Sequence, residues 1–159
     1  MPKKTKLPPE KALPKEVKVE KIDLLVVVHP DSLCGSLWTS GLTGCQAITD
    51  KLLAEISDWQ GPRVAVYGDN EEELDEYREV GDVIYEIADV VDGSPDSKGL
   101  AQAAKDILKL HPAGKLNRVL VTGAWANPED GCVTTVAAEL RKLAPGVTVD
   151  VSPLAPLYP

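Results

Sequence analysis

Blocks of consecutive apolar residues alternate with longer amphipathic stretches along most of this chain. Residues 24–28 form an uninterrupted Leu/Val run that ends at His29-Pro30, which is the pattern of a strand buried on both faces. Similar runs predict three more strands, at residues 64–67, 119–122 and 147–151. The stretch 83–91 is ambiguous, because it fits one strand at 83–87, a second short strand at 89–91, or a single bent segment.

The amphipathic stretches between these runs predict helices. Residues 42–59 place a set of apolar side chains on one helical face, and Gly61-Pro62 ends the stretch; the set is Ile48, Leu52, Leu53, Ile56 and Trp59. Residues 71–80 predict an acidic, exposed helix, and residues 97–110 and 132–143 predict two helices with apolar inward faces. Strands joined through helices require crossover connections and therefore a parallel sheet. The predicted fold class is a three-layer α/β/α domain with a mostly parallel central sheet.

Composition separates the ends of the chain from its centre. Pro8, Pro9 and Pro14 interrupt any helix near the start, so we expect residues 1–21 to form a basic, flexible Pro/Lys-rich tail. We expect residues 22–152 to form a single α/β domain, since 159 residues suit one hydrophobic core. Residues 153–159 are rich in Pro and predict an extended C-terminal tail.

The charge balance limits the classes of partner. The chain carries 17 Lys and Arg against 25 Asp and Glu, a net charge of −8, which argues against a general nucleic-acid binder. Residues 1–21 hold seven Lys and three Glu, a net of +4, so the remainder carries −12. A tail and body of opposite sign leave three roles open for the tail. It lies on the acidic body, it contacts a partner, for example in a salt-sensitive homo-oligomer, or it is simply solvated.

The lack of a recognisable membrane or secretory segment predicts a cytoplasmic protein. No apolar run approaches the roughly 18 to 20 residues of a membrane helix, and the basic start lacks the apolar segment of a secretory signal. Cys34, Cys45 and Cys132 show no CxxC spacing, which favours free thiols over a disulfide framework or a zinc site. The motifs GxGxxG and GxxxxGK[ST] are absent from the sequence, so we expect no dinucleotide or nucleotide cofactor. Because the cysteines also have no His-rich partner segment, we expect no metal.

Polar side chains gather after the predicted strands, where ligands bind in open parallel sheets. The residues that we expect at a small-molecule site are His29, Asp31, Ser32 and Cys34 after the first strand, Asp69 after the second, and Trp125, Asn127, Gly131 and Cys132 after residues 119–122. The alternative for Asp69 is to cap the helix that follows it.

Cys132 is the best candidate for a nucleophile. It would open a helix directly after a strand and a Gly-containing loop, where exposed amides favour the thiolate form. The alternative is a small apolar residue that packs the helix against the sheet. His29 or Asp31 would then serve as general base, and we expect an extended backbone at His29 because Pro30 follows. A packing or capping role for His29 stays open.

Two stretches resemble a known family. The strand 24–28 followed by Leu33-Cys34-Gly35-Ser36-Leu37, and the residues 119–123 followed by Gly131-Cys132-Val133, are similar to segments of the isochorismatase-like cysteine hydrolases, which include nicotinamidases. The resemblance covers residues 22–153 as an architecture of Rossmann-like topology, and it is specific only in those two stretches.

The resemblance implies a chemistry on non-peptide C–N bonds, in which an Asp acts as base, a Lys supports it and a Cys attacks a small amide or related substrate. The Cys corresponds to Cys132. The position of the Asp falls at His29, with Asp31 two residues later, and no Lys occurs in residues 83–91. Two functions therefore stay open: a divergent cysteine hydrolase, or a catalytically inactive protein of the same fold with a binding or assembly role.

Overall fold

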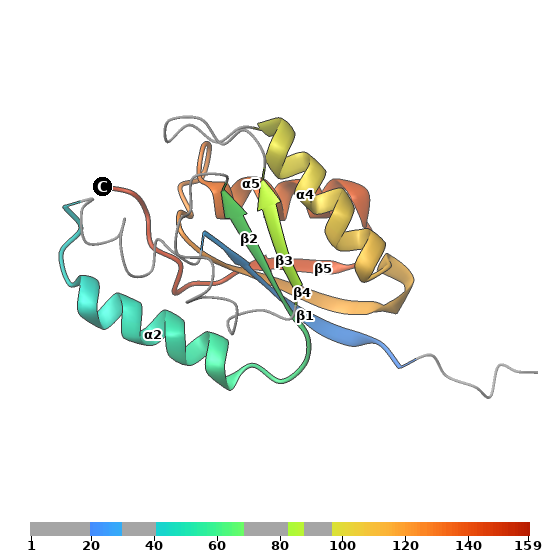
Figure 1. Cartoon of the computed structure of the whole chain (residues 1–159), viewed down its shortest axis with the longest axis horizontal. Coiled ribbons are helices and arrows are strands. Elements are labelled where there is room, and N and C mark those ends of the chain that lie inside the picture. Colours follow the sequence, from blue (N-terminus) through green and yellow to red (C-terminus); the bar gives the residue numbers. More distant parts are fainter. Residues whose placement is uncertain (1–19, 30–40, 69–82, 88–96) are drawn as a thin grey trace, which may run out of the picture.

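The structure is a computed structural model, and it describes residues 20–29, 41–68, 83–87 and 97–159. Its elements, labelled as in Figure 1, are β1 (Ile22–Val28), α2 (Cys45–Asp58), β2 (Arg63–Gly68), β3 (Val83–Ile87), α4 (Ser97–Leu110), a short 3-10 helix (Ala113–Lys115), β4 (Leu116–Gly123), α5 (Cys132–Leu143) and β5 (Thr148–Val151).

The described strands form one sheet in which every pairing is parallel. Their order is β3-β2-β1-β4-β5, so the first strand of the sequence lies at the centre of the sheet. Val26 of β1 pairs with Val64 of β2 on one side and with Val121 of β4 on the other. This arrangement confirms the predicted parallel sheet.

Each side of the sheet has its own hydrophobic core. Leu24, Val26 and Val28 pack with residues of α4 and α5, whereas Leu25 and Val27 pack with residues of α2. All five side chains are fully buried, because successive residues of a strand point to opposite faces. Figure 1 shows α2 on one side of the sheet and α4 with α5 on the other. The three-layer α/β/α fold is confirmed.

Two of the predicted helices, α4 and α5, have the predicted bounds, and β3 takes the first of the alternatives considered for residues 83–91. The prediction for residues 42–59 was too long, because α2 begins at Cys45 and ends at Asp58. Gly44 precedes the helix with a φ of 74°, a left-handed conformation that a helical residue does not adopt. Trp59 follows the helix with an extended ψ of 131°, so it does not belong to the helical face on which we expected it.

Several predictions fall on other parts of the chain. The helix expected at 71–80, the second alternative at 89–91 and residues 1–19 of the expected basic tail lie outside the described residues. Among the helices that are described, none combines the length and the apolar character needed to cross a bilayer.

An ion pair on the surface links the last two strands. Arg118 Nε of β4 lies 3.3 Å from Asp150 Oδ2 of β5, and the two side chains are 40% and 51% exposed. We expect Asp150→Asn to lower the free energy of unfolding by only about 0.5 kcal/mol, because solvent screens an exposed pair. Urea unfolding at low and high salt measures this effect, which should vanish at high salt. A loss above about 1 kcal/mol would contradict the assignment as an ordinary surface pair.

Candidate functional site

The carboxyl ends of β1 and β4 lie side by side. Val28, the last residue of β1, pairs with Gly123, the last residue of β4, and the amide of Ala124 donates to the carbonyl of Val28 at 3.1 Å. The chain crosses from β1 to β2 in one direction and from β3 to β4 in the other, so the strand order reverses between β1 and β4. In doubly wound α/β sheets, ligands bind at the point where this reversal occurs.

His29 lies at this edge of the sheet, directly after β1. Its amide donates to the carbonyl of Val66 in β2 at 2.8 Å, and its residue is half-buried. Its φ is 53°, so the extended backbone that we predicted from Pro30 is wrong. The register of β1 with both neighbours extends through Val28, and His29 follows it in a left-handed conformation. Histidine is among the residue types enriched in this conformation.

Cys132 is the first residue of α5, as predicted. It is half-buried and packs against the core that β1 shares with α4 and α5. Cys132 therefore has apolar residues on one side. This packing matches the alternative role for Cys132, that of a small apolar residue that packs the helix against the sheet. Part of the residue remains accessible to solvent.

The amides at the start of α5 are partly engaged by the loop that precedes the helix. The amide of Gly131 donates to the carbonyl of Asn127, and the amide of Val133 donates to the carbonyl of Trp125, each at 3.0 Å. The first amides of a helix lack partners within the helix, and here loop carbonyls satisfy two of them. These two donors are consequently committed within the chain.

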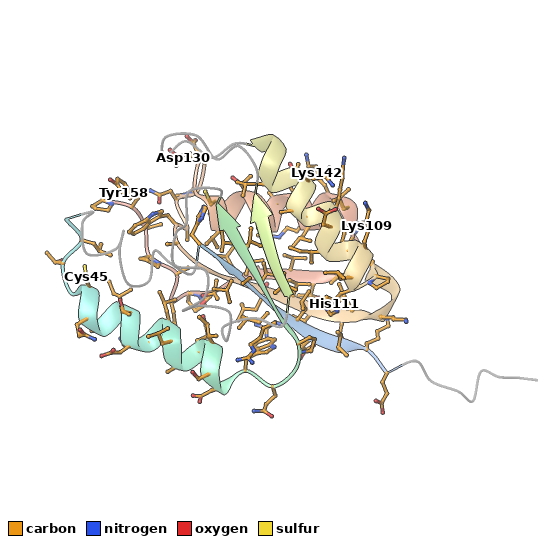
Figure 2. The ribbon with its side chains drawn as sticks, in the orientation of Figure 1. Cys45, Lys109, His111, Asp130, Lys142 and Tyr158 are labelled. Atoms are coloured by element: carbon orange, nitrogen blue, oxygen red, sulfur yellow. The ribbon has the colours of Figure 1, made fainter. Side chains whose placement is uncertain are left out.

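Trp125 and Asn127 lie in the loop between β4 and α5 and contact the end of the chain. The rings of Trp125 and Tyr158 meet edge to face, with centroids 5.0 Å apart. Asn127 makes two hydrogen bonds to the backbone of Tyr158. Figure 2 shows Tyr158 at the end of the molecule opposite His111, which follows the last residue of α4.

Of the nine predicted site residues, Asp31, Ser32, Cys34 and Asp69 lie outside the described residues.

A polar cluster that the sequence analysis did not identify lies under α2. Glu55 Oε1 accepts a hydrogen bond of 2.6 Å from Thr122 Oγ1, and Glu55 Oε2 accepts one of 2.7 Å from Ser152 Oγ. Thr122 is fully buried and Ser152 is 2% exposed, whereas Glu55 is half-buried. A signal was present in the sequence, since Glu55 adjoins Ile56 in the predicted inward face and a carboxylate there needs a polar partner.

The described side chains do not assemble an evident metal centre. Within residues 20–29, 41–68, 83–87 and 97–159, no three His, Cys, Asp or Glu side chains gather in a way that could hold a metal ion.

Comparison with known proteins does not assign the chain to a family. No protein-family model matches it, and no curated protein matches it. Among solved structures, a mutant of O-ureido-L-serine synthase with O-ureido-L-serine bound aligns with a TM-score of 0.28 and 18% identity. The alignment covers 89% of this chain and 46% of that chain, so this chain spans about half the length of the synthase. A likeness at this level identifies neither a fold family nor an activity.

Proposed function

We propose that this protein is a divergent isochorismatase-like hydrolase that cleaves a small amide or related compound with Cys132 as nucleophile. The observation that carries the proposal is the pairing of Val28 with Gly123. This pairing puts His29 beside the loop that leads to Cys132. A nucleophile and a base that come from neighbouring strand ends at a reversal of strand order are a common arrangement in α/β enzymes.

The proposed reaction has two steps. The sulfur of Cys132 attacks the carbonyl carbon of the amide, a C–S bond forms, and the C–N bond breaks. The proton removed from the thiol by His29 or Asp31 passes to the leaving nitrogen. Water then attacks the thioester, which releases the acid and restores the thiol. The backbone amide of Cys132, in the first turn of α5, is the donor that we assign to the developing oxyanion, because the Gly131 amide already donates to Asn127.

A second function is favoured by a different observation. The Cys132 side chain packs against the apolar core, and the amides of Gly131 and Val133 donate to carbonyls of their own loop. The sequence also lacks the Lys that the family resemblance implies for residues 83–91. These features suit a protein that keeps the fold without the hydrolytic chemistry and serves a binding or assembly role.

Alkylation of the thiols separates the two functions. We expect iodoacetamide near neutral pH to label Cys132 in the folded chain faster than in the urea-unfolded chain, with each site followed by peptide mass spectrometry. Cys45 is an internal reference, because it is 7% exposed and its Sγ donates to the carbonyl of Leu42 at 2.8 Å. Labelling of folded Cys132 no faster than the unfolded thiol would reject the hydrolase and leave the binding role.

The role of the base is tested with two conservative variants. His29→Asn removes the imidazole but keeps a residue type that tolerates a φ of 53°, whereas Ala at this position would add backbone strain. We expect either His29→Asn or Asp31→Asn to slow the labelling of Cys132 about tenfold or more. Equal rates in both variants and the unmodified protein would show that neither residue activates the thiol.

A further inference from the structure

The loop of residues 125–127 is held from two sides. On one side its carbonyls accept the amides of Gly131 and Val133 at the start of α5, both at 3.0 Å. On the other side the amide of Ala126 donates to the carbonyl of Pro156 at 2.8 Å. The conformation of this loop therefore depends both on the helix that follows it and on a segment near the end of the chain.

Asn127 fastens this segment most directly. Its Oδ1 accepts the amide of Tyr158 at 2.8 Å, and its Nδ2 donates to the carbonyl of Tyr158 at 3.2 Å, so one side chain pairs with both backbone groups of one residue. The edge-to-face contact of Trp125 with Tyr158 adds an apolar component. Asn127, which we predicted as a substrate contact, uses both polar atoms of its side chain within the chain.

The residues that lead to this C-terminal segment, 152–155, are anchored at Ser152. Its amide donates to the carbonyl of Val121 at 2.8 Å, and its hydroxyl accepts the amide of Leu154 at 3.1 Å. The amide of Ala155 donates to the carbonyl of Ser152 at 3.1 Å, which closes a turn. This turn directs residues 156–158 back over the loop, and in Figure 1 the end of the chain lies at the same end of the molecule as the start of α2.

Residues 156–158 are held mainly by hydrogen bonds with Ala126 and Asn127 and little by burial. Leu157 and Tyr158 are each 54% exposed. Such a segment can detach without opening the hydrophobic core, because few apolar contacts would be lost.

We propose that Asn127 and residues 156–158 form a strap that fixes the β4–α5 loop and thereby the first turn of α5. This inference rests on the proposed function in one respect: if Cys132 is an activated nucleophile, Asn127 is a positioning residue for it. The strap acts through the carbonyls of Trp125 and Asn127, whose hydrogen bonds to α5 flank Cys132 on both sides.

Hydrogen exchange followed by mass spectrometry tests the strap. Asn127→Ala removes both side-chain bonds to Tyr158, and we expect exchange of the Gly131 and Val133 amides to become about tenfold faster. A chain that ends at Ala155 should show the same change. Asn117→Ala is the matched control, because Asn117 donates to Asp23 Oδ1 near the amino ends of the strands. Exchange at α5 that is equal in Asn127→Ala and Asn117→Ala would overturn the strap.

Alkylation tests the positioning role separately. We compare the iodoacetamide labelling rate of Cys132 near neutral pH with the rate in mildly alkaline buffer, and we expect the ratio of the two rates to fall about threefold in Asn127→Ala. Simple loosening of the structure would raise both rates together and leave the ratio unchanged, which would overturn the positioning role. If Cys132 in the unmodified chain labels no faster than the unfolded thiol, the proposed function fails, and hydrogen exchange still decides whether the strap exists.

Discussion

Replacing Gly123 with Ala is expected to abolish the stable fold or to lower the free energy of unfolding by more than about 4 kcal/mol. A Cβ atom at Gly123 would lie 2.1 Å from the carbonyl oxygen of Val28 and 2.7 Å from its nitrogen. Gly123 also has a φ of 114°, which residues with a side chain rarely adopt. The clash of the added Cβ with Val28 could be relieved only if β1 and β4 separated at the centre of the sheet. Val28 cannot simply move aside, because it also pairs with Val66 in β2.

Urea unfolding followed by tryptophan fluorescence measures this effect. Gly146→Ala is the matched control, since an added Cβ there would meet no heavy atom within 4 Å. We expect that variant to change the free energy of unfolding by less than about 1 kcal/mol. A Gly123→Ala protein that unfolds at the same urea concentration as Gly146→Ala would contradict the close approach of β1 and β4.

The second large effect is expected for Glu55→Ala, which should lower the free energy of unfolding by about 2 to 4 kcal/mol. The carboxylate accepts from two hydroxyls that are themselves buried, those of Thr122 and Ser152. Without Glu55 both hydroxyls lose their charged acceptor in a site where water has little access. We place the expected loss below the sum of two charged hydrogen bonds because Glu55 itself is only half-buried.

Two comparisons make the Glu55 prediction specific. Glu55→Gln should cost less than Glu55→Ala, because the amide oxygen still accepts from one hydroxyl and the amide nitrogen donates to the other. Glu139→Ala removes the partner of the exposed Lys142 side chain, at 3.1 Å in the same helix, and should cost about 0.5 kcal/mol or less. If Glu55→Ala and Glu139→Ala shift the urea midpoint equally, the buried cluster does not stabilise the fold.

The Glu55 cluster also joins the fold to the strap. Ser152 accepts the amide of Leu154 and donates its hydroxyl proton to Glu55, so α2 holds the turn from which residues 156–158 return. Loss of Glu55 should therefore loosen residues 156–158 in addition to destabilising the domain. Hydrogen exchange of the Ala126 amide in Glu55→Ala, measured under conditions where the variant is folded, reports on this link.

Helix bounds could be predicted well where local signals were strong. His111-Pro112 follows α4, and Gly131 precedes α5 with an extended backbone, so both helices have the predicted bounds. The start of α2 was predicted less well, because a glycine is compatible with many conformations and only the structure shows Gly44 in a left-handed one. The backbone of His29 was also predicted wrongly. The proline that follows it favours an extended backbone, whereas the structure shows a φ of 53°.

Which residues follow the carboxyl ends of the strands could be predicted from the sequence, but what they contact could not. Residues that follow buried strands in a parallel sheet must lie at one edge, and His29, Trp125, Asn127 and Cys132 do so. Which of them use their polar groups inside the chain could not be read from the sequence. Asn127 is bound to Tyr158, 31 residues away, and no periodic pattern connects these two positions.

The sequence by itself determined the layers of this protein, because a side-chain period of two or of 3.6 states which face of an element is buried. It also determined that polar and thiol groups follow the strands. The tertiary structure alone decided which strand ends are neighbours and which donors are already satisfied. Thr122 and Ser152 reach Glu55 across 67 and 97 residues of chain, and hydrogen bonds at such separations depend on strand order, which apolar periodicity does not encode.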